Sequence, residues 1–109
     1  MGCIPDNEHE LQAWLARFAS IVARNPSAMG VTTEEADHLL SLTETFDRAA
    51  AIARNPMRRT ESNLALKAEA RNAATALARQ LARRIKSNPS INMDLKFELG
   101  IVRAIASRH

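Results

Sequence analysis

Apolar residues recur along this chain at intervals of three and four positions, and three Asn-Pro pairs interrupt the pattern. The pairs are Asn25-Pro26, Asn55-Pro56 and Asn88-Pro89. Proline cannot continue a helix from the preceding turn, and it disfavours helical backbone in the residue before it. Each pair therefore marks the end of a helix. The sequence predicts three long helices and a shorter segment after the third stop.

The first predicted helix spans residues 7 to 24. Asn7 is a favourable N-cap, and Glu10, three residues later, would complete a capping box. The apolar residues recur with the spacing of one helix face: Leu11, Trp14, Leu15, Phe18, Ile21 and Val22. We expect this face to be buried, with Trp14 as an anchor of the core.

The second predicted helix spans residues 33 to 54. Thr32 and Glu35 have the spacing of a capping box, and acidic residues in the first turn favour the positive end of the helix dipole. The inward stripe is predicted to contain Leu39, Leu42, Phe46, Ala49, Ala50 and Ala53. Leu40 and Ile52 fall outside this stripe, so we expect them to contact a neighbour or a partner.

The third predicted helix spans residues 61 to 87 and begins after Thr60, a favourable N-cap. Its many alanines raise helix propensity and allow close approach of a neighbouring helix. The predicted seam alternates small and large residues: Leu66, Ala70, Ala74 or Ala73, Leu77, Leu81 and Ile85. This is the best-supported helix of the chain.

A short fourth helix is predicted over residues 93 to 99. Asn92 would cap its start, and Gly100 would end it in a left-handed conformation. Ile91, Leu95 and Leu99 would face the bundle, and residues 101 to 109 form a tail without a clear period. Short connections favour antiparallel neighbours. We therefore expect one all-α domain over residues 1 to 109, an up-down-up antiparallel three-helix bundle with a short fourth helix.

Composition narrows the class of protein. Aromatic residues make up 4% and there are three glycines, which argues against β-rich folds with their many glycine turns. The formal charge is +3, so a nucleic-acid partner is permitted without being implied. Cys3 is the single cysteine and cannot form an internal disulfide. No apolar run approaches the roughly 18 residues of a membrane span. We expect a cytoplasmic protein that does not enter membranes.

Groups able to carry chemistry are few and scattered. Glu34 and His38 share a helix face, but one histidine and one carboxylate make only half of a metal site. Glu44 and Asp47 are three positions apart, yet nothing in the local sequence would separate their pKa values for acid–base work. His9 lies between two glutamates that point away from it on a helix. We expect no catalytic residue, no metal and no cofactor.

Two candidate surfaces remain. The first is an apolar interaction surface, for a protein partner or a homo-oligomer, that comprises Leu40, Ile52, Ile101, Val102 and Ile105. The second is a basic face for weak, sequence-independent binding of nucleic acid, and it comprises Arg58, Arg59, Arg79, Arg83 and Lys86. No aromatic side chain lies among these arginine and lysine residues to stack on nucleotides. The protein interaction surface is therefore the leading hypothesis.

The motifs at the predicted helix ends occur in an order that resembles a known protein family. The stretches concerned are Ile4-Pro5 with Trp14 and Phe18, Asn25-Pro26 through Gly30-Val31-Thr32, Arg59-Thr60, Ala82-Arg83-Arg84-Ile85, Asn88-Pro89 and Leu99-Gly100-Ile101. Together they resemble the N-terminal helical module of a group of uncharacterised bacterial proteins. The resemblance covers nearly the whole chain and implies a helical fold, with no established activity to transfer. Many members continue through a proline-containing linker into a β-sandwich domain, and this chain departs from them by ending at His109.

Overall fold

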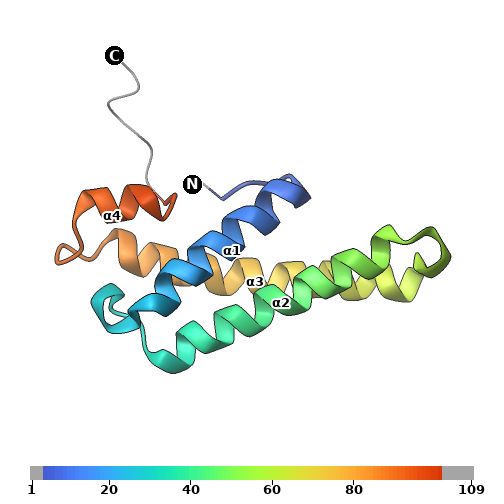
Figure 1. Cartoon of the computed structure of the whole chain (residues 1–109), viewed down its shortest axis with the longest axis horizontal. Coiled ribbons are helices and arrows are strands. Elements are labelled where there is room, and N and C mark those ends of the chain that lie inside the picture. The colour runs from blue at the N-terminus through green and yellow to red at the C-terminus, as the bar shows by residue number, and fades with distance from the viewer. Residues whose placement is uncertain (1–3, 102–109) are drawn as a thin grey trace, which may run out of the picture.

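The computed structural model describes residues 4–101, which form a bundle of α-helices without any strand (Figure 1). The helices are α1 (Glu8–Arg24), α2 (Thr33–Arg54), α3 (Glu61–Lys86) and α4 (Met93–Glu98). Short 3-10 helices at Pro26–Met29 and Pro56–Arg58 form the two turns that follow the first two Asn-Pro stops. The all-α fold is confirmed, and every predicted helix boundary lies within one residue of the observed one.

Side-chain caps explain why the helices begin where they do. Thr32 and Glu35 form the full capping box, with both reciprocal hydrogen bonds at 3.0 Å. Thr60 Oγ1 accepts a hydrogen bond from a backbone N–H of α3, and Asn92 Oδ1 does the same for α4. At Asn7 only half of the predicted box forms: its side chain accepts from the backbone N–H of Glu10, without the reciprocal bond. Each satisfied donor removes part of the cost of a helix start.

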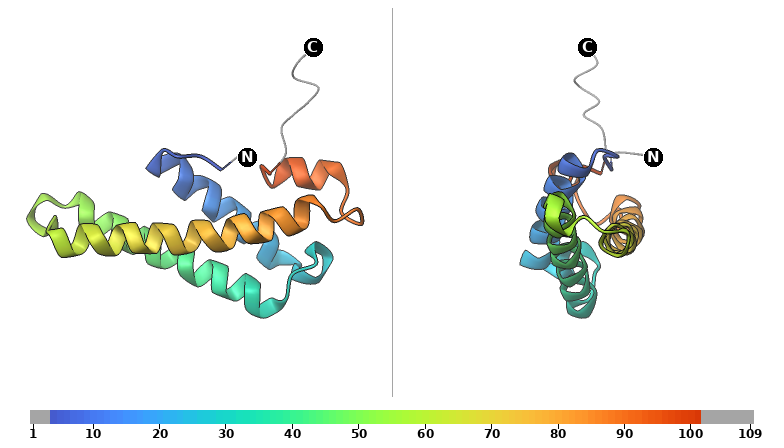
Figure 2. Two further views of the ribbon diagram at one scale, coloured as in Figure 1. Left: turned by 180° about the vertical axis from the view of Figure 1, so that it is seen from behind. Right: turned by 90° about the vertical axis from the view of Figure 1, so that its right-hand side faces the viewer.

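The helices lie in two layers. Figure 2 shows α1 and α2 together on one side and α3 on the other. The molecule measures 18 Å along its shortest axis and 47 Å along its longest. That thickness fits two layers of helices whose axes are about 8–10 Å apart. α2 and α3 make the most extensive contact, α1 packs mainly on α2, and α4 lies beside the C-terminal end of α3.

The core lies between the layers, and both layers contribute large and small buried residues to it. Its largest fully buried side chains are Phe18, Phe46, Leu11, Leu15, Leu39, Leu81, Ile85, Leu99 and Val22. From α3 the seam is Ala70, Ala74 and Ala78, followed by Leu81. Alanine at these positions lets the backbone of α3 approach the neighbouring helices closely. The core is therefore built on close helix packing, as the composition suggests.

The prediction that Leu66 belongs to the seam is wrong, because its side chain is 56% exposed. Ala70, Ala74 and Ala78 follow one another at intervals of four, and each step of four turns the buried arc by about 40° around the helix. Extended backwards, that drift carries position 66 to the edge of the arc. Leu66 also belongs to the second turn of α3. This end of α3, next to the α2–α3 turn, is the end of the molecule farthest from α4 (Figure 1).

Trp14 lies at the edge of the core and not inside it, which corrects the expectation of a buried anchor. Its ring stacks on Phe18 with centroids 4.8 Å apart. Its indole Nε1 donates a hydrogen bond to the carbonyl oxygen of Gly100 at 3.2 Å. Gly100 has φ of 75°, so it ends α4 in the predicted left-handed conformation. Trp14 thus holds the segment after α4 against α1.

Candidate interaction surfaces

Three members of the predicted apolar surface lie within the described residues, and none of the three is fully exposed. Ile101 is 6% exposed and belongs to the core, and Leu40 is half-buried and packs against the core. Ile52 is also half-buried, but it lies twelve positions after Leu40 on α2, which places it about 120° away around the helix. Val102 and Ile105 lie outside the described residues. The described members of the set therefore do not share one exposed face.

Within the part of the chain that the structure describes, exposed large apolar side chains occur singly. They are Met57 at 89%, Leu66 at 56% and Met93 at 61% exposure. Met57 belongs to the turn between α2 and α3, whereas Met93 begins α4 near the opposite end of the molecule. Isolated exposed apolar residues are usual on protein surfaces. They do not define a docking patch.

The predicted basic face divides into two groups. Arg79, Arg83 and Lys86 share one exposed arc in the last two turns of α3. Arg58 and Arg59 are exposed as well, but they precede the first residue of α3. The axial rise of the helix separates the two groups by about 30 Å. The five cations therefore lie at opposite ends of the helix and do not form one continuous face.

Two other arginines of α3 are engaged in structural contacts. Arg84 forms a two-bond ion pair with Glu35 at 2.8 Å and also donates to the carbonyl oxygen of Gly30. Hydrogen bonding from Arg84, together with the backbone N–H of Thr32, lowers the pKa of Glu35 to about 2. Arg71 donates to the carbonyl oxygen of Asp6. These contacts hold α3 to the start of α2 and to the segment before α1.

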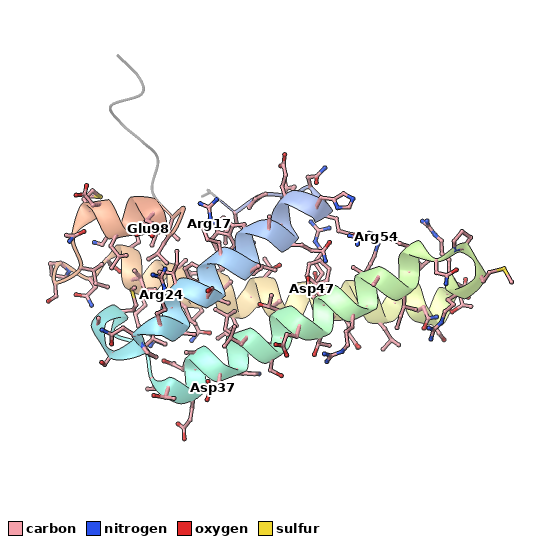
Figure 3. The ribbon with its side chains drawn as sticks, viewed as in Figure 1. Arg17, Arg24, Asp37, Asp47, Arg54 and Glu98 are labelled. Carbon is pink, nitrogen blue, oxygen red and sulfur yellow. The ribbon has the colours of Figure 1, made fainter. Side chains whose placement is uncertain are left out.

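A polar network joins the first half of α1 to the other two long helices. Glu8 pairs with Lys67 at 2.9 Å and with Arg54 at 3.0 Å. Gln12 donates to Asp47 at 2.8 Å and accepts from Arg54. Figure 3 shows Asp47 and Arg54 on the part of α2 that lies beside the start of α1. The hydrogen bond from Lys67 is the main cause of a lowered pKa at Glu8.

This network changes the interpretation of the candidate carboxylate pair. Asp47 is bound by an amide of α1, while Glu44 is exposed. Glu34 and His38 are exposed at the start of α2, and His9 is exposed on α1. Across residues 4–101, no three side chains among His, Cys, Asp and Glu come together as a metal site. The ionisable groups with clear partners serve to connect helices.

Among residues 4–101, one long surface is left uncovered by other described residues, the outer face of α3. We define it by residues that lie opposite the buried seam and are all exposed: Glu61, Ala65, Ala68, Asn72, Ala76, Arg79 and Arg83. Their spacing of three or four keeps them within an arc of about 80°. Seen from behind the view of Figure 1, α3 crosses the front of the molecule with no described helix over it (Figure 2). The sequence shows these alanines at helical spacing. The same pattern is expected of any strongly helix-forming segment, so it did not identify an exposed face.

Two further contacts near α4 escaped sequence reasoning. Lys96 is 6% exposed, and its Nζ donates to the backbone carbonyl oxygen of Lys86 at 2.8 Å. The bond satisfies a free carbonyl at the C-terminal end of α3. Trp14 and Gly100 are 86 positions apart. Neither pairing has a local sequence signal.

Comparison of the chain with protein-family models, with curated proteins and with solved structures gives no match. Among the described residues, every helix is too short or too polar to cross a membrane.

Proposed function

We propose that this chain is a non-enzymatic helical interaction module, which associates with a second copy of itself or with another protein. The observation that carries the proposal is the outer face of α3, a helix of 26 residues exposed along its whole length on one side of a thin molecule. A small domain buries a limited part of its surface, and association is a common supplement.

The distribution of charged contacts supports a binding role over a catalytic one. Glu8, Glu35 and Asp47 each bind a side chain of another helix. An acid or base in a reaction needs a group directed towards a substrate, with its pKa adjusted for proton transfer. Here the lowered pKa values of Glu8 and Glu35 come from contacts that hold the bundle together. We also propose, from the boundary motifs, a relationship to the bacterial helical module that the sequence resembles.

The test is the mass of the protein in solution. Light scattering at a dilute and at a millimolar protein concentration, each at low and high salt, separates association from a monomer. A mass that rises with protein concentration supports the module, and a smaller rise at high salt indicates that charged residues contribute. A monomer under all four conditions overturns the self-association form of the proposal, and the chain would then have to act through another protein.

The alternative function is weak, sequence-independent binding of nucleic acid by the three cations at the end of α3. Arg79, Arg83 and Lys86 favour it because they are exposed on one arc. Three phosphate contacts would give a slope of about −2.7 for the logarithm of affinity against the logarithm of salt concentration. Replacing all three by Gln should abolish such binding. Replacing Arg58 and Arg59 by Gln is the matched control at the other end of α3.

A further inference from the structure

The outer face of α3 has opposite charges towards its two ends. Glu61 begins the face, and Arg79 and Arg83 end it. Between them lie alanines and one asparagine, Asn72. On an ordinary solvated helix face, long charged side chains would occupy these middle positions as often as the ends. Here the centre of the arc is low and uncharged, with the exposed Glu69 at its edge, about 60° from Asn72 around the helix. A second helix could therefore approach the centre of the arc closely.

We propose that two copies of the chain associate through the outer faces of α3, with the two helices antiparallel around a two-fold axis at Asn72. The inference rests on the proposed role as an interaction module, and it names the surface and the partner. A two-fold interface uses the same patch on both copies, so the patch must complement itself. Antiparallel pairing at this axis brings together positions whose numbers add to 144, twice 72.

The residues of the outer face complement each other in this register. Glu61 lies opposite Arg83 of the second copy, and Ala68 lies opposite Ala76. Ala65 lies opposite Arg79, so a small residue leaves room for a long side chain. Asn72 meets itself, and its carboxamide carries both donors and an acceptor for two reciprocal hydrogen bonds. The Glu61–Arg83 pairs, the small residues and the amide therefore fit one symmetric arrangement, in which Arg79 has no charged residue opposite it.

Other occupants fit less well. In a parallel pair, Arg79 and Arg83 would face their own copies, which places like charges together. A nucleic acid or an acidic helix would suit the arginines but would leave Glu61 beside another negative charge. A second copy in the antiparallel orientation is the occupant that uses both ends of the face.

The same geometry limits the strength of the dimer. From Glu61 to Arg83 the helix is about 33 Å long, so a strip about 10 Å wide gives roughly 700 Å² over both copies. This is below the 1,200 Å² or so at which standard stable interfaces begin. Lys86 lies beyond the paired length and near Arg58 of the second copy, where like charges oppose association. We therefore expect a weak dimer that forms only at high protein concentration.

Disulfide trapping tests the register. In a Cys3→Ser background, Asn72→Cys places a thiol on the two-fold axis and should form a covalent dimer under mild oxidation. Ala65→Cys lies on the same face but away from the axis, and it should cross-link only when combined with Arg79→Cys. Cross-linking of Ala65→Cys alone to the same extent as Asn72→Cys would refute antiparallel pairing at this register.

Sedimentation equilibrium up to about 1 mM protein tests the face in the absence of cross-links. Ala68→Glu should weaken dimerisation at least tenfold, because it buries a carboxylate against Ala76 of the second copy. Ala73→Glu is the matched control, since this exposed alanine of α3 lies about 100° from Asn72 around the helix. Far-UV circular dichroism should show both variants folded.

The outcomes separate this inference from the proposed function. If the chain dimerises but Ala68→Glu behaves like Ala73→Glu and Asn72→Cys does not cross-link, pairing through α3 is wrong while self-association stands. If the unmodified chain stays monomeric throughout, pairing through α3 and the self-association form of the proposed function both fail.

Discussion

Replacement of Gly100 by alanine probes how Trp14 holds the segment after α4. Gly100 has φ of 75°, and a left-handed conformation costs a residue with a Cβ roughly 1–2 kcal/mol. A Cβ at this position would also lie 2.8 Å from Trp14 Nε1. The indole must then shift, and its hydrogen bond to the Gly100 carbonyl would be lost, at about 0.5–1.5 kcal/mol. We expect Gly100→Ala to destabilise the protein by about 1.5–3.5 kcal/mol in total.

Gly30 provides a matched control within the same chain. Its φ is 72°, and its added Cβ would lie 3.1 Å from Asn88 Nδ2, the end of a flexible side chain that can move. Gly30→Ala carries the same backbone strain and the same reduction of unfolded-state entropy, without the contact to Trp14. The difference between the two variants therefore isolates the indole contact.

Urea unfolding followed by circular dichroism gives the two free energies of unfolding. Trp14 is the only tryptophan, so its fluorescence reports the contact directly. We expect a change of emission in Gly100→Ala and none in Gly30→Ala. In a Trp14→Phe background, the additional cost of Gly100→Ala should shrink. Equal destabilisation by the two glycine variants, with unchanged fluorescence in both, would refute the reasoning.

Three further outcomes follow from the contacts. Thr32→Ala should lower the free energy of unfolding by about 1 kcal/mol in urea melts, because it removes the capping box; an unchanged midpoint would contradict that role. Because the pKa of Glu35 is lowered to about 2, its pairing with Arg84 should stabilise the fold above about pH 4.5 and be lost as pH falls towards 2; Glu35→Gln should flatten this part of a stability profile measured against pH. Leu81→Ala should cost about 2–5 kcal/mol and Leu66→Ala less than 1, measured by the same melts, whereas equal losses would restore Leu66 to the core.

The helix boundaries were predictable because their signals are local. An Asn-Pro stop or a Thr32–Glu35 cap acts through residues at most a few positions away, and the backbone obeys it in almost any surroundings. The facing of α3 was less predictable. With eight alanines among its 26 residues, the pattern cannot show which alanines face a neighbour, and Leu66 was assigned to the wrong side.

The candidate surfaces could not be read from the sequence for a related reason. Leu40 is excluded from the simple inward stripe of α2, yet it packs against the core from the side of that helix. The partner that occupies Arg84 lies 49 positions away, and the partner of Trp14 lies 86 positions away. Which cations are available for binding depends on these long-range contacts.

The order of helix contacts also bears on how the chain folds. α2 and α3 are neighbours in sequence and share the largest contact, so their pairing requires closure of a short loop only. Chains dominated by such local contacts fold in microseconds to milliseconds. The contact between Trp14 and Gly100 closes almost the whole chain into a loop. Its entropic cost is lower once the helices between the two residues have packed. We therefore expect the α2–α3 hairpin to form early, and the tryptophan signal to report the last step of folding.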